Sequence, residues 1–260
     1  MQSLIENLIE GVMRRCPPEK GDYLCEDDGY IHCGKCHGSK QQHIRIGKND
    51  YIVPIMCSCM TAEINNKKNA EIHAEKLKKS AEIRSRCFGN NGKNANMTFS
   101  ADRYPDSRES TYCRQYVCEK AFLEQGLLLY GGVGTGKTYY GCCILNELIN
   151  MGYECKFIHL GDAVQQLFSG KFDLGSIQTP DILMLDDLGT TRETDYATEQ
   201  IYNIIDSRDR SGKPVIITTN LTPSVIKNAI DLPHRRIYDR ILEMCQHRVQ
   251  VLGKSKRSGL

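Results

Sequence analysis

Short apolar runs and longer amphipathic stretches alternate along the second half of the chain. The apolar runs lie at residues 127–130, 155–159, 182–185 and 213–220. Continuous apolar runs of this length are typical of strands that are buried on both faces of a parallel sheet. Each run is separated from the next by a stretch long enough for a helix. The pattern therefore predicts repeated strand–helix units, which form a parallel sheet with helices on both faces.

Helices are indicated where apolar residues recur every three or four positions. The first such helix follows residue 138. Its apolar residues are Tyr140, Ile144, Leu148 and Met151, and it ends at Gly152. Further helices are predicted from Asp162 to Gly170, over 195–208 and in the region of 112–123. These helices supply the two layers that cover the sheet.

The first 110 residues show a different pattern. Residues 61–86 place alanine and leucine at helical spacing among seven lysines and arginines, which predicts a basic amphipathic helix. Four acidic residues are interleaved, so this helix is either simply solvated or in contact with nucleic acid or a partner. Residues 88–110 are rich in glycine, asparagine and serine. We expect an N-terminal partner-binding domain at 1–86, a linker at 87–110 and a larger domain at 111–260.

Composition narrows the classes of protein to which the chain can belong. The net charge of +2 at pH 7 excludes a uniformly basic nucleic-acid-binding protein. No apolar run is long enough to span a membrane. Residues 1–15 carry Glu6 and Glu10 within the apolar spacing, which predicts a short amphipathic helix and not the unbroken apolar core of a signal peptide. We therefore expect a cytoplasmic protein without a membrane partner, in which thirteen cysteines are reduced and partly bound to metal.

A phosphate-binding loop organises the larger domain. Residues 126–138 read GLLLYGGVGTGKT, so the strand at 127–130 leads into the pattern G-x-x-x-x-G-K-[ST] and then into a helix. The glycines let backbone N–H groups approach phosphate oxygens, and the helix N-terminus favours negative charge. We expect a nucleotide to contact Gly131, Gly132, Val133, Gly134, Thr135, Gly136, Lys137 and Thr138.

Two aspartates follow the strand at 182–185, at the edge where open α/β sheets bind ligands. We expect Asp186 to hold Mg²⁺ through water beside the Thr138 hydroxyl, and Asp187 to orient the attacking water. Asn220 ends the strand beside the acidic one. Its amide could reach the water or the γ-phosphate, although asparagine is also a common strand-ending turn former.

Residues 25–59 form a cysteine-rich module with few aliphatic residues. Cys33 and Cys36 make a C-x-x-C pair, and Cys57 and Cys59 make a C-x-C pair. The twenty residues between the pairs allow them to close one four-thiolate zinc site, whose role would be structural because no coordination position is left for water. The alternative is that the cysteines are free or merely packed. The other candidate ligands are Cys25, His32, His37 and His43.

These motifs together resemble a known family. With YGGVGTGKT, LDDLG and ITTN at these separations, residues 120–257 closely resemble the DnaC/DnaI/IstB group of AAA+ ATPases. That group ends in D-R-[IL], a short strand and G-x-S-x-R, which the chain matches with Asp239, Arg240, Ile241, the run 247–252, Gly253, Ser255 and Arg257. The fold class implied is α/β: a P-loop AAA+ (ASCE) three-layer parallel sheet with helices on both faces, plus a small N-terminal zinc-binding and helical domain.

The resemblance implies roles that the residues alone would not reveal. Arg240 would be the arginine finger supplied to the neighbouring subunit's ATP, which requires self-assembly through AAA+ interfaces. Arg257 would be the second sensor and Asn220 the first. A guanidinium aimed at the γ-phosphate stabilises the charge that develops during phosphoryl transfer. The chain departs from the pattern at Asp187, where most AAA+ ATPases carry glutamate, and this shorter carboxylate implies slow turnover suited to a switch.

The N-terminal third resembles that of bacterial and phage-type helicase loaders, whose cysteine-bearing domain binds the replicative helicase. We therefore expect an ATPase that binds ATP, Mg²⁺, Zn²⁺ and single-stranded DNA and loads a replicative DNA helicase. One alternative is an IstB-like transposition helper, which would not be expected to carry the cysteine module. Another is a zinc-dependent nucleic-acid-binding adaptor that does not hydrolyse its nucleotide. ATP turnover with and without single-stranded DNA separates this adaptor from the loader.

Overall fold

A computed structural model describes residues 19–89, 92–189, 194–229 and 231–252. The chain divides into two compact units, Met1–Glu75 and Lys76–Leu260. The amphipathic helix predicted at residues 1–15 lies outside the described residues. No helix among the described residues combines the length and the apolar character that a membrane crossing requires.

The first unit is built from two small antiparallel hairpins. Strands β1 (Tyr23–Leu24) and β2 (Ile31–His32) form the first, and β3 (Gln41–Ile46) and β4 (Asn49–Pro54) form the second. The buried Lys40 ammonium contacts the Asp22 carboxylate at 2.6 Å and so ties the two hairpins to the segment before β1. Apolar residues contribute little to this unit, in which Tyr23, Leu24, Ile46 and Ile52 are exposed.

Helix α2 (Ser58–Phe88) begins in the first unit and ends in the second. Its side chains are mostly exposed up to Lys79, including Leu77 of the predicted apolar face, and none is buried before Ser80. Its last turns join the core of the second unit through Ile83, Cys87 and Phe88. The short helices α3 (Gly92–Ala95) and η1 (Phe99–Ala101) follow, and Phe99 is also buried in that core.

The second unit alternates strands and helices, as the sequence pattern predicts. Its elements are α4 (Arg108–Cys118), η2 (Ala121–Leu123), β5 (Leu127–Tyr130), α5 (Lys137–Met151), β6 (Cys155–His159), α6 (Leu160–Phe168), α7 (Gly175–Gln178), β7 (Ile182–Leu188), α8 (Asp195–Arg210), β8 (Val215–Thr219), α9 (Pro223–Lys227), α10 (Leu232–Met244) and β9 (His247–Gln250). The end of one strand differs from the prediction. Strand β7 continues beyond the predicted residue 185, so both aspartates lie within it.

The five strands form one parallel sheet in the order β6-β7-β8-β5-β9. Strand β8 therefore lies between the strand that leads into the phosphate-binding loop and the acidic strand. All carboxyl ends of these strands lie at one edge of the sheet, which brings the residues that follow β5 and β8 together with the end of β7. This edge is where the candidate site is found.

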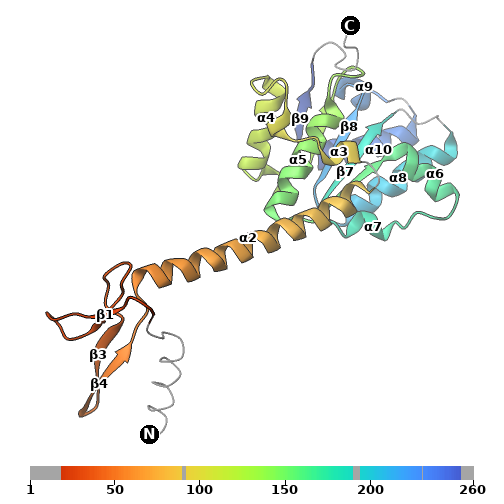
Figure 1. Ribbon diagram of the computed structural model, residues 1–260. Coiled ribbons are helices and arrows are strands. Elements are labelled where there is room, and N and C mark those ends of the chain that lie inside the picture. Colours follow the sequence, from red (N-terminus) through yellow and green to blue (C-terminus); the bar gives the residue numbers. More distant parts are fainter. Residues whose placement is uncertain (1–18, 90–91, 190–193, 230, 253–260) are drawn as a thin grey trace. The chain divides into compact units, whose positions relative to one another are not determined.

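The core of the second unit has two layers because successive strand residues point to opposite faces. Leu127 and Leu129 of β5 pack with α4 and α5 on one face, whereas Leu128 packs with α6, α8 and α10 on the other. Figure 1 shows the helices of this unit distributed over both faces of the sheet. The prediction of a three-layer parallel α/β fold is confirmed.

A buried arginine holds the opposite edge of the sheet. The Arg208 side chain on α8 is fully buried, and all three guanidinium nitrogens donate to main-chain carbonyls. The acceptors are the carbonyls of Ile177, Pro180, Asp181 and Pro214. Asp181 and Pro214 directly precede β7 and β8. Although burial lowers the pKa of Arg208 to about 10, the group remains charged at neutral pH.

Candidate functional site

The phosphate-binding loop has a backbone that depends on glycine. It joins β5 to α5, and Gly131, Gly134 and Gly136 have φ angles of 145°, 77° and 109°, in the region that favours glycine. At Gly131 there is also no room for a side chain, because a Cβ atom would lie 2.4 Å from the Val251 carbonyl oxygen beyond β9. The loop is therefore shaped for backbone N–H groups to face an anion at the start of α5.

Lys137 lies inside this loop and joins it to the neighbouring strand. Its side chain is buried, and its ammonium donates to the carbonyl oxygens of Gly131 and Gly132 at 3.0 and 2.7 Å. It also donates to the Asn220 side-chain oxygen at 2.8 Å. Asn220 directly follows β8, which is the strand between β5 and β7. The fold thus brings the predicted lysine and the predicted polar sensor into direct contact.

Asp186 is the buried acid of the site. Its Oδ1 atom accepts hydrogen bonds from the Thr138 hydroxyl at 2.9 Å and from the Thr218 hydroxyl at 2.6 Å. Burial raises the pKa of Asp186, while the two hydroxyl groups act in the opposite direction. The predicted neighbours Thr138 and Asp186 are therefore in contact, in a place where a carboxylate is costly unless a cation accompanies it.

Asp187 is held in an unusual backbone conformation. Its φ angle is 69°, in the left-handed region that residues other than glycine adopt rarely, although aspartate is among those that tolerate it best. The register between β7 and β8 shifts between Leu185 and Leu188, so the strand is irregular here. The Asp187 N–H donates to the Thr218 hydroxyl at 2.9 Å. The irregularity gives Asp186 and Asp187 different surroundings: Asp186 is 5% exposed, whereas the Asp187 side chain is 39% exposed.

Two further side chains of this site, Thr218 and His159, are not predicted by the sequence pattern. Thr218 uses one hydroxyl to donate to Asp186 and to accept from Asp187. His159, the last residue of β6, places Nε2 at 3.8 Å from the Asp187 carboxylate. The only signal in the sequence is position, since each residue lies at the carboxyl end of a strand beside β7. A polar residue at such a place could have been proposed once the strand order was known.

Of the two arginines implied by the family resemblance, only Arg240 is among the described residues, and its contacts are with α8. Arg240 on α10 forms an ion pair with Asp206 of α8, and its guanidinium lies over the Tyr202 ring at 5.0 Å. Its side chain remains 29% exposed. Arg257 lies outside the described residues, as do Gly253 and Ser255. Among the described residues, the group around Lys137, Asp186 and Asn220 is thus assembled without either arginine.

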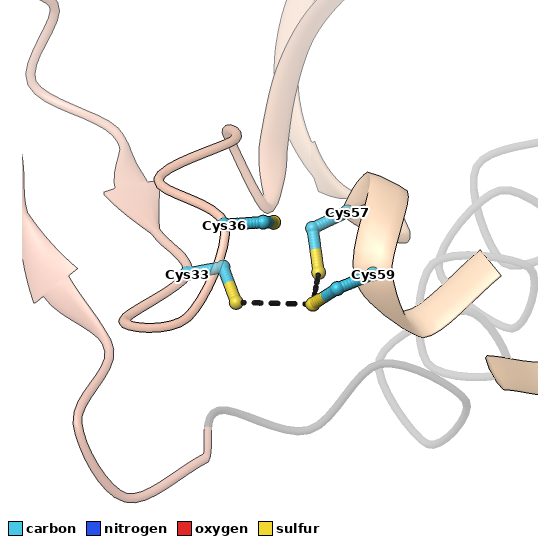
Figure 2. Close-up of side chains that lie close together, drawn as sticks. All are labelled: Cys33, Cys36, Cys57 and Cys59. Carbon is cyan, nitrogen blue, oxygen red and sulfur yellow. Dashed lines mark hydrogen bonds between the residues drawn. The ribbon is translucent and has the colours of Figure 1, made fainter. Parts of the chain in front are cut away.

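The four predicted cysteine ligands come together in the first unit. Figure 2 shows Cys33 and Cys36 on one loop facing Cys57 and Cys59 at the start of α2. The four Sγ atoms all lie within 4.8 Å of one another, and that of Cys59 is 3.5 Å from Cys33 and 3.3 Å from Cys57. Hydrogen bonds from the Ser58 hydroxyl and from the backbone N–H groups of Cys59 and Gly38 lower the pKa of Cys36 to about 5. Contact with the other thiols, Cys57 first, raises the pKa of Cys59 to about 12.

Comparison with known proteins identifies the family to which this chain belongs. Residues 96–259 match the family described as "IstB-like ATP binding protein". The XkdC protein of the phage-like element PBSX from Bacillus subtilis (strain 168) is 26% identical over 255 residues, covering 93% of this chain and 90% of that protein.

Two relatives are named as replicative helicase loaders. The alignment with DnaI of Bacillus subtilis (strain 168) is 26% identical and covers 51% of this chain and 48% of DnaI. That with DnaC of Escherichia coli (strain K12) is 31% identical and covers 49% of this chain and 54% of DnaC. The chain thus spans about half the length of these two relatives. A crystal structure of DnaI shares the fold, with a TM-score of 0.56 at 21% identity over 67% of this chain and 99% of that chain.

We predict that Asp186→Asn stabilises the protein in the absence of divalent cations. Because the folded-state pKa of Asp186 is raised, its contribution to stability is present at acid pH and is lost as the pH rises through that pKa. An asparagine keeps an oxygen that can accept from Thr138 and Thr218. The melting temperature at pH 7 in EDTA should rise by a few degrees, since about 1 kcal/mol corresponds to ~2–4 °C in a domain of this size.

The matched control is Asp187→Asn, whose side chain is more exposed and should change the melting temperature less. The gain from Asp186→Asn should shrink as the pH is lowered. A lower melting temperature for Asp186→Asn at pH 7 would contradict the assignment of Asp186 as a destabilising buried charge.

Proposed function

Because the chain belongs to the family of IstB-like ATP-binding proteins, we propose that it hydrolyses ATP to place a replicative DNA helicase on single-stranded DNA. The main structural support is the joining of Lys137 to Asn220 and of Thr138 to Asp186, which combines loop, acid and sensor in one site. The two relatives named as helicase loaders support the choice of partner. Each part of the proposal rests on a separate set of residues.

The residues of the loop fit the phosphates of ATP together with Mg²⁺. Backbone N–H groups between Gly131 and Thr138 and the Lys137 ammonium bind the phosphates, and Lys137 exchanges its contacts with backbone carbonyls for phosphate oxygens. Asp186 is a buried carboxylate whose hydrogen-bond partners Thr138 and Thr218 are uncharged, so a divalent cation would neutralise it. When bound, Mg²⁺ neutralises charge on the β- and γ-phosphates.

Asp187 and Asn220 are proposed to act on the water that attacks the γ-phosphate. Asp187 is the more exposed of the two acids and lies at the same edge of the sheet, so its carboxylate can accept a hydrogen bond from water. His159 lies close enough to Asp187 to restrain that carboxylate. The Asn220 amide, already in contact with Lys137, can orient the water or the γ-phosphate. Turnover is slow because an aspartate reaches less far than glutamate.

The cysteine cluster is proposed to hold one structural zinc ion. Four sulfurs around a tetrahedral zinc lie about 3.8 Å apart, which the observed separations approach. Cys36 is already acidic, and the raised pKa of Cys59 would be lowered by the cation. Since the unit buries few large apolar side chains, the metal would supply much of its folding free energy. This unit is the proposed binding site for the helicase.

An exposed pair of aromatic residues is proposed to bind single-stranded DNA. Phe168 at the end of α6 is 79% exposed, and its ring meets that of Tyr196 on α8 edge to face, with centroids 5.5 Å apart. Both residues line an open pocket of about 440 Å³ together with Val164 and Gln165. Exposed aromatic rings are the usual platforms on which unpaired bases stack. Gly161 in the first turn of α6 and Tyr196 in the first turn of α8 both line this pocket, at the ends of the helices that follow β6 and β7, whereas Phe168 is the last residue of α6.

Arg240 is proposed to act on ATP bound to a neighbouring subunit, with Arg257 sensing the nucleotide of its own subunit. In the single chain Arg240 is paired with Asp206 and stacked on Tyr202, so it must leave Asp206 to reach another subunit. Because the Arg240 side chain is partly exposed, a neighbouring subunit could contact it. Self-assembly would then couple release of an ion pair within the subunit to completion of the neighbouring site.

A transposition helper is the second candidate, since the matched family is itself described as IstB-like. In that function the partner of the first unit would be a transposase. The close approach of the four cysteines favours the loader, because the resemblance of the N-terminal third to helicase loaders implies that such a module binds the helicase. The helicase-loading experiment described below separates the two, since a helper would leave the helicase in solution.

Lys137→Ala should weaken ATP binding by about 100-fold or more, because it removes the charged donor to the phosphates, and each such hydrogen bond contributes about 1.5–3 kcal/mol. Asp187→Asn should keep ATP affinity and lose turnover, since it leaves the phosphate-binding residues intact. Binding is measured with a fluorescent ATP analogue and turnover as phosphate release. If both variants lose binding equally, the roles are misassigned.

Phe168→Ala should weaken binding of the full chain to an oligo(dT) by about 5- to 150-fold, because stacking on one aromatic ring contributes about 1–3 kcal/mol. ATP affinity should not change, and Phe168→Tyr should retain DNA binding. The wild-type chain should also transfer the replicative helicase of its own organism onto a circular single strand, and Phe168→Ala should reduce this transfer. Equal loading with and without the chain would rule out the loader function.

Mixing two inactive variants tests whether Arg240 acts between subunits. Arg240→Ala keeps an intact phosphate-binding loop and Lys137→Ala keeps the arginine, so neither should hydrolyse ATP alone. Their mixture should recover turnover at interfaces where an intact arginine faces an intact loop. Arg210→Ala, which removes the other partner of Asp206, is the matched control and should remain active. Full activity of Arg240→Ala alone would show that Arg240 is a surface cation.

A further inference from the structure

A second group of metal-ligating side chains lies in the first unit, apart from the four cysteines. Cys25, Asp28 and His32 surround the turn between β1 and β2, and one ligand atom from each lies within 4.8 Å of the others. The group shares no residue with the four-cysteine cluster. It is accessible from solvent, since the side chains of His32 and Asp28 are 15% and 39% exposed. The group combines a thiol, a carboxylate and an imidazole, whereas an ordinary ion pair would contain only the last two.

The orientation of His32 is that of a metal ligand. Its Nδ1 atom lies 2.9 Å from the His37 carbonyl oxygen, which can only accept a hydrogen bond, so Nδ1 carries the proton. Its Nε2 atom faces Asp28 Oδ2 at 2.8 Å. At 2.8 Å from a carboxylate oxygen, Nε2 shares a proton with Asp28, and a metal that enters displaces this proton to solvent and takes the Nε2 lone pair, while Nδ1 keeps its bond to the carbonyl. The backbone thus fixes His32 with Nε2 directed into the group.

The other two side chains are directed to the same point. The Tyr30 N–H donates to Asp28 Oδ1 at 2.9 Å, which leaves Oδ2 facing His32. The Cys25 thiol also hydrogen-bonds the Asp28 carboxylate. Backbone hydrogen bonds from Gly29 N to Cys25 O and from Cys25 N to Tyr30 O, each 2.9 Å long, fix the turn. An Asp28–His32 ion pair alone would not account for the thiol that converges on it.

We propose that Cys25, Asp28 and His32 form a second metal site, which binds a zinc-like divalent cation through Sγ, Oδ2 and Nε2. A thiolate with an imidazole selects zinc and similar transition metals over Mg²⁺ and Ca²⁺. Tetrahedral coordination requires oxygen and nitrogen ligands about 3.3 Å apart, so Asp28 and His32 separate only slightly when the metal enters. Three protein ligands leave the fourth position to water or to an external ligand.

This second site differs from the four-cysteine site in strength and in role. It has one thiolate instead of four and is more exposed, so it binds metal more weakly and exchanges it more readily. His32 and Cys33 are consecutive, so one peptide bond connects the two sites. Metal at the second site clamps the β1–β2 hairpin, which the two-residue strands alone hold weakly. The surface of the first unit would thus become more rigid when free zinc is abundant.

The test is a metal titration of the full chain. Protein passed over a weak chelator should retain one equivalent of Zn²⁺ at the four cysteines and then bind a second equivalent of added Co²⁺. The second equivalent should show a thiolate-to-cobalt charge-transfer band with the intensity of a single thiolate. Cys25→Ser and His32→Ala should lose this second equivalent and retain the first. Elemental analysis and absorption spectra measure the two equivalents separately.

Two variants serve as matched controls, Cys118→Ser for an exposed thiol and His43→Ala for an exposed imidazole of the same unit. Both should bind two equivalents. Circular dichroism and ATP affinity confirm that each variant is folded. The proposal is overturned if the wild-type chain binds no second equivalent, if Cys25→Ser still binds it, or if Cys25→Ser loses the first equivalent instead.

Discussion

The Asp186 carboxylate is the group on which the geometry of the nucleotide site depends. It lies on β7 and accepts hydrogen bonds from Thr138 at the start of α5 and from Thr218 on β8, so one oxygen atom joins three elements. The Thr218 hydroxyl continues the chain of contacts to the backbone of Asp187, whose left-handed conformation it supports. The hydrogen bond from Lys137 to Asn220 is a second connection, which joins the loop to the residue that follows β8. Two threonines and one lysine thereby hold the loop at a fixed distance from the acids.

The local motifs could be predicted from the sequence, whereas the contacts between them could not. The strand at 127–130 and the loop after it are specified by neighbouring residues, and the structure has that strand at the predicted positions. Thr218 and His159 escape prediction because their roles depend on which strands are adjacent. The conformation of Asp187 depends on the register shift between β7 and β8, which is a property of the pair of strands. The pairing of Arg240 with Asp206 likewise requires knowledge of how α8 and α10 pack.

The cysteines also show how far the sequence alone can predict which side chains come together. Spacing alone identified Cys33, Cys36, Cys57 and Cys59 as one group, and the structure brings them together. It could not show that Cys25 and His32 belong to a different group, because Asp28 is an ordinary loop residue in sequence. The twelve described cysteines form no disulfide, and six of them are buried in the second unit as small apolar side chains. Burial raises the pKa of Cys87 and Cys245 to about 12, so these thiols stay protonated and chemically quiet.

Because Arg208 binds main-chain carbonyls at only one edge of the sheet, the two edges differ in how well they tolerate substitutions. The carbonyls that precede β7 and β8 are committed to its guanidinium, and a lysine there would have too few donors to replace it. At the other edge the loop from Gly131 to Thr138 is shaped to offer its N–H groups to a ligand, and the Asp187 side chain is partly exposed. Substitutions that alter a partner or a substrate can therefore accumulate at one end of the strands without disturbing the contacts that fix their other end. The fold keeps its architecture and its adaptability in separate places.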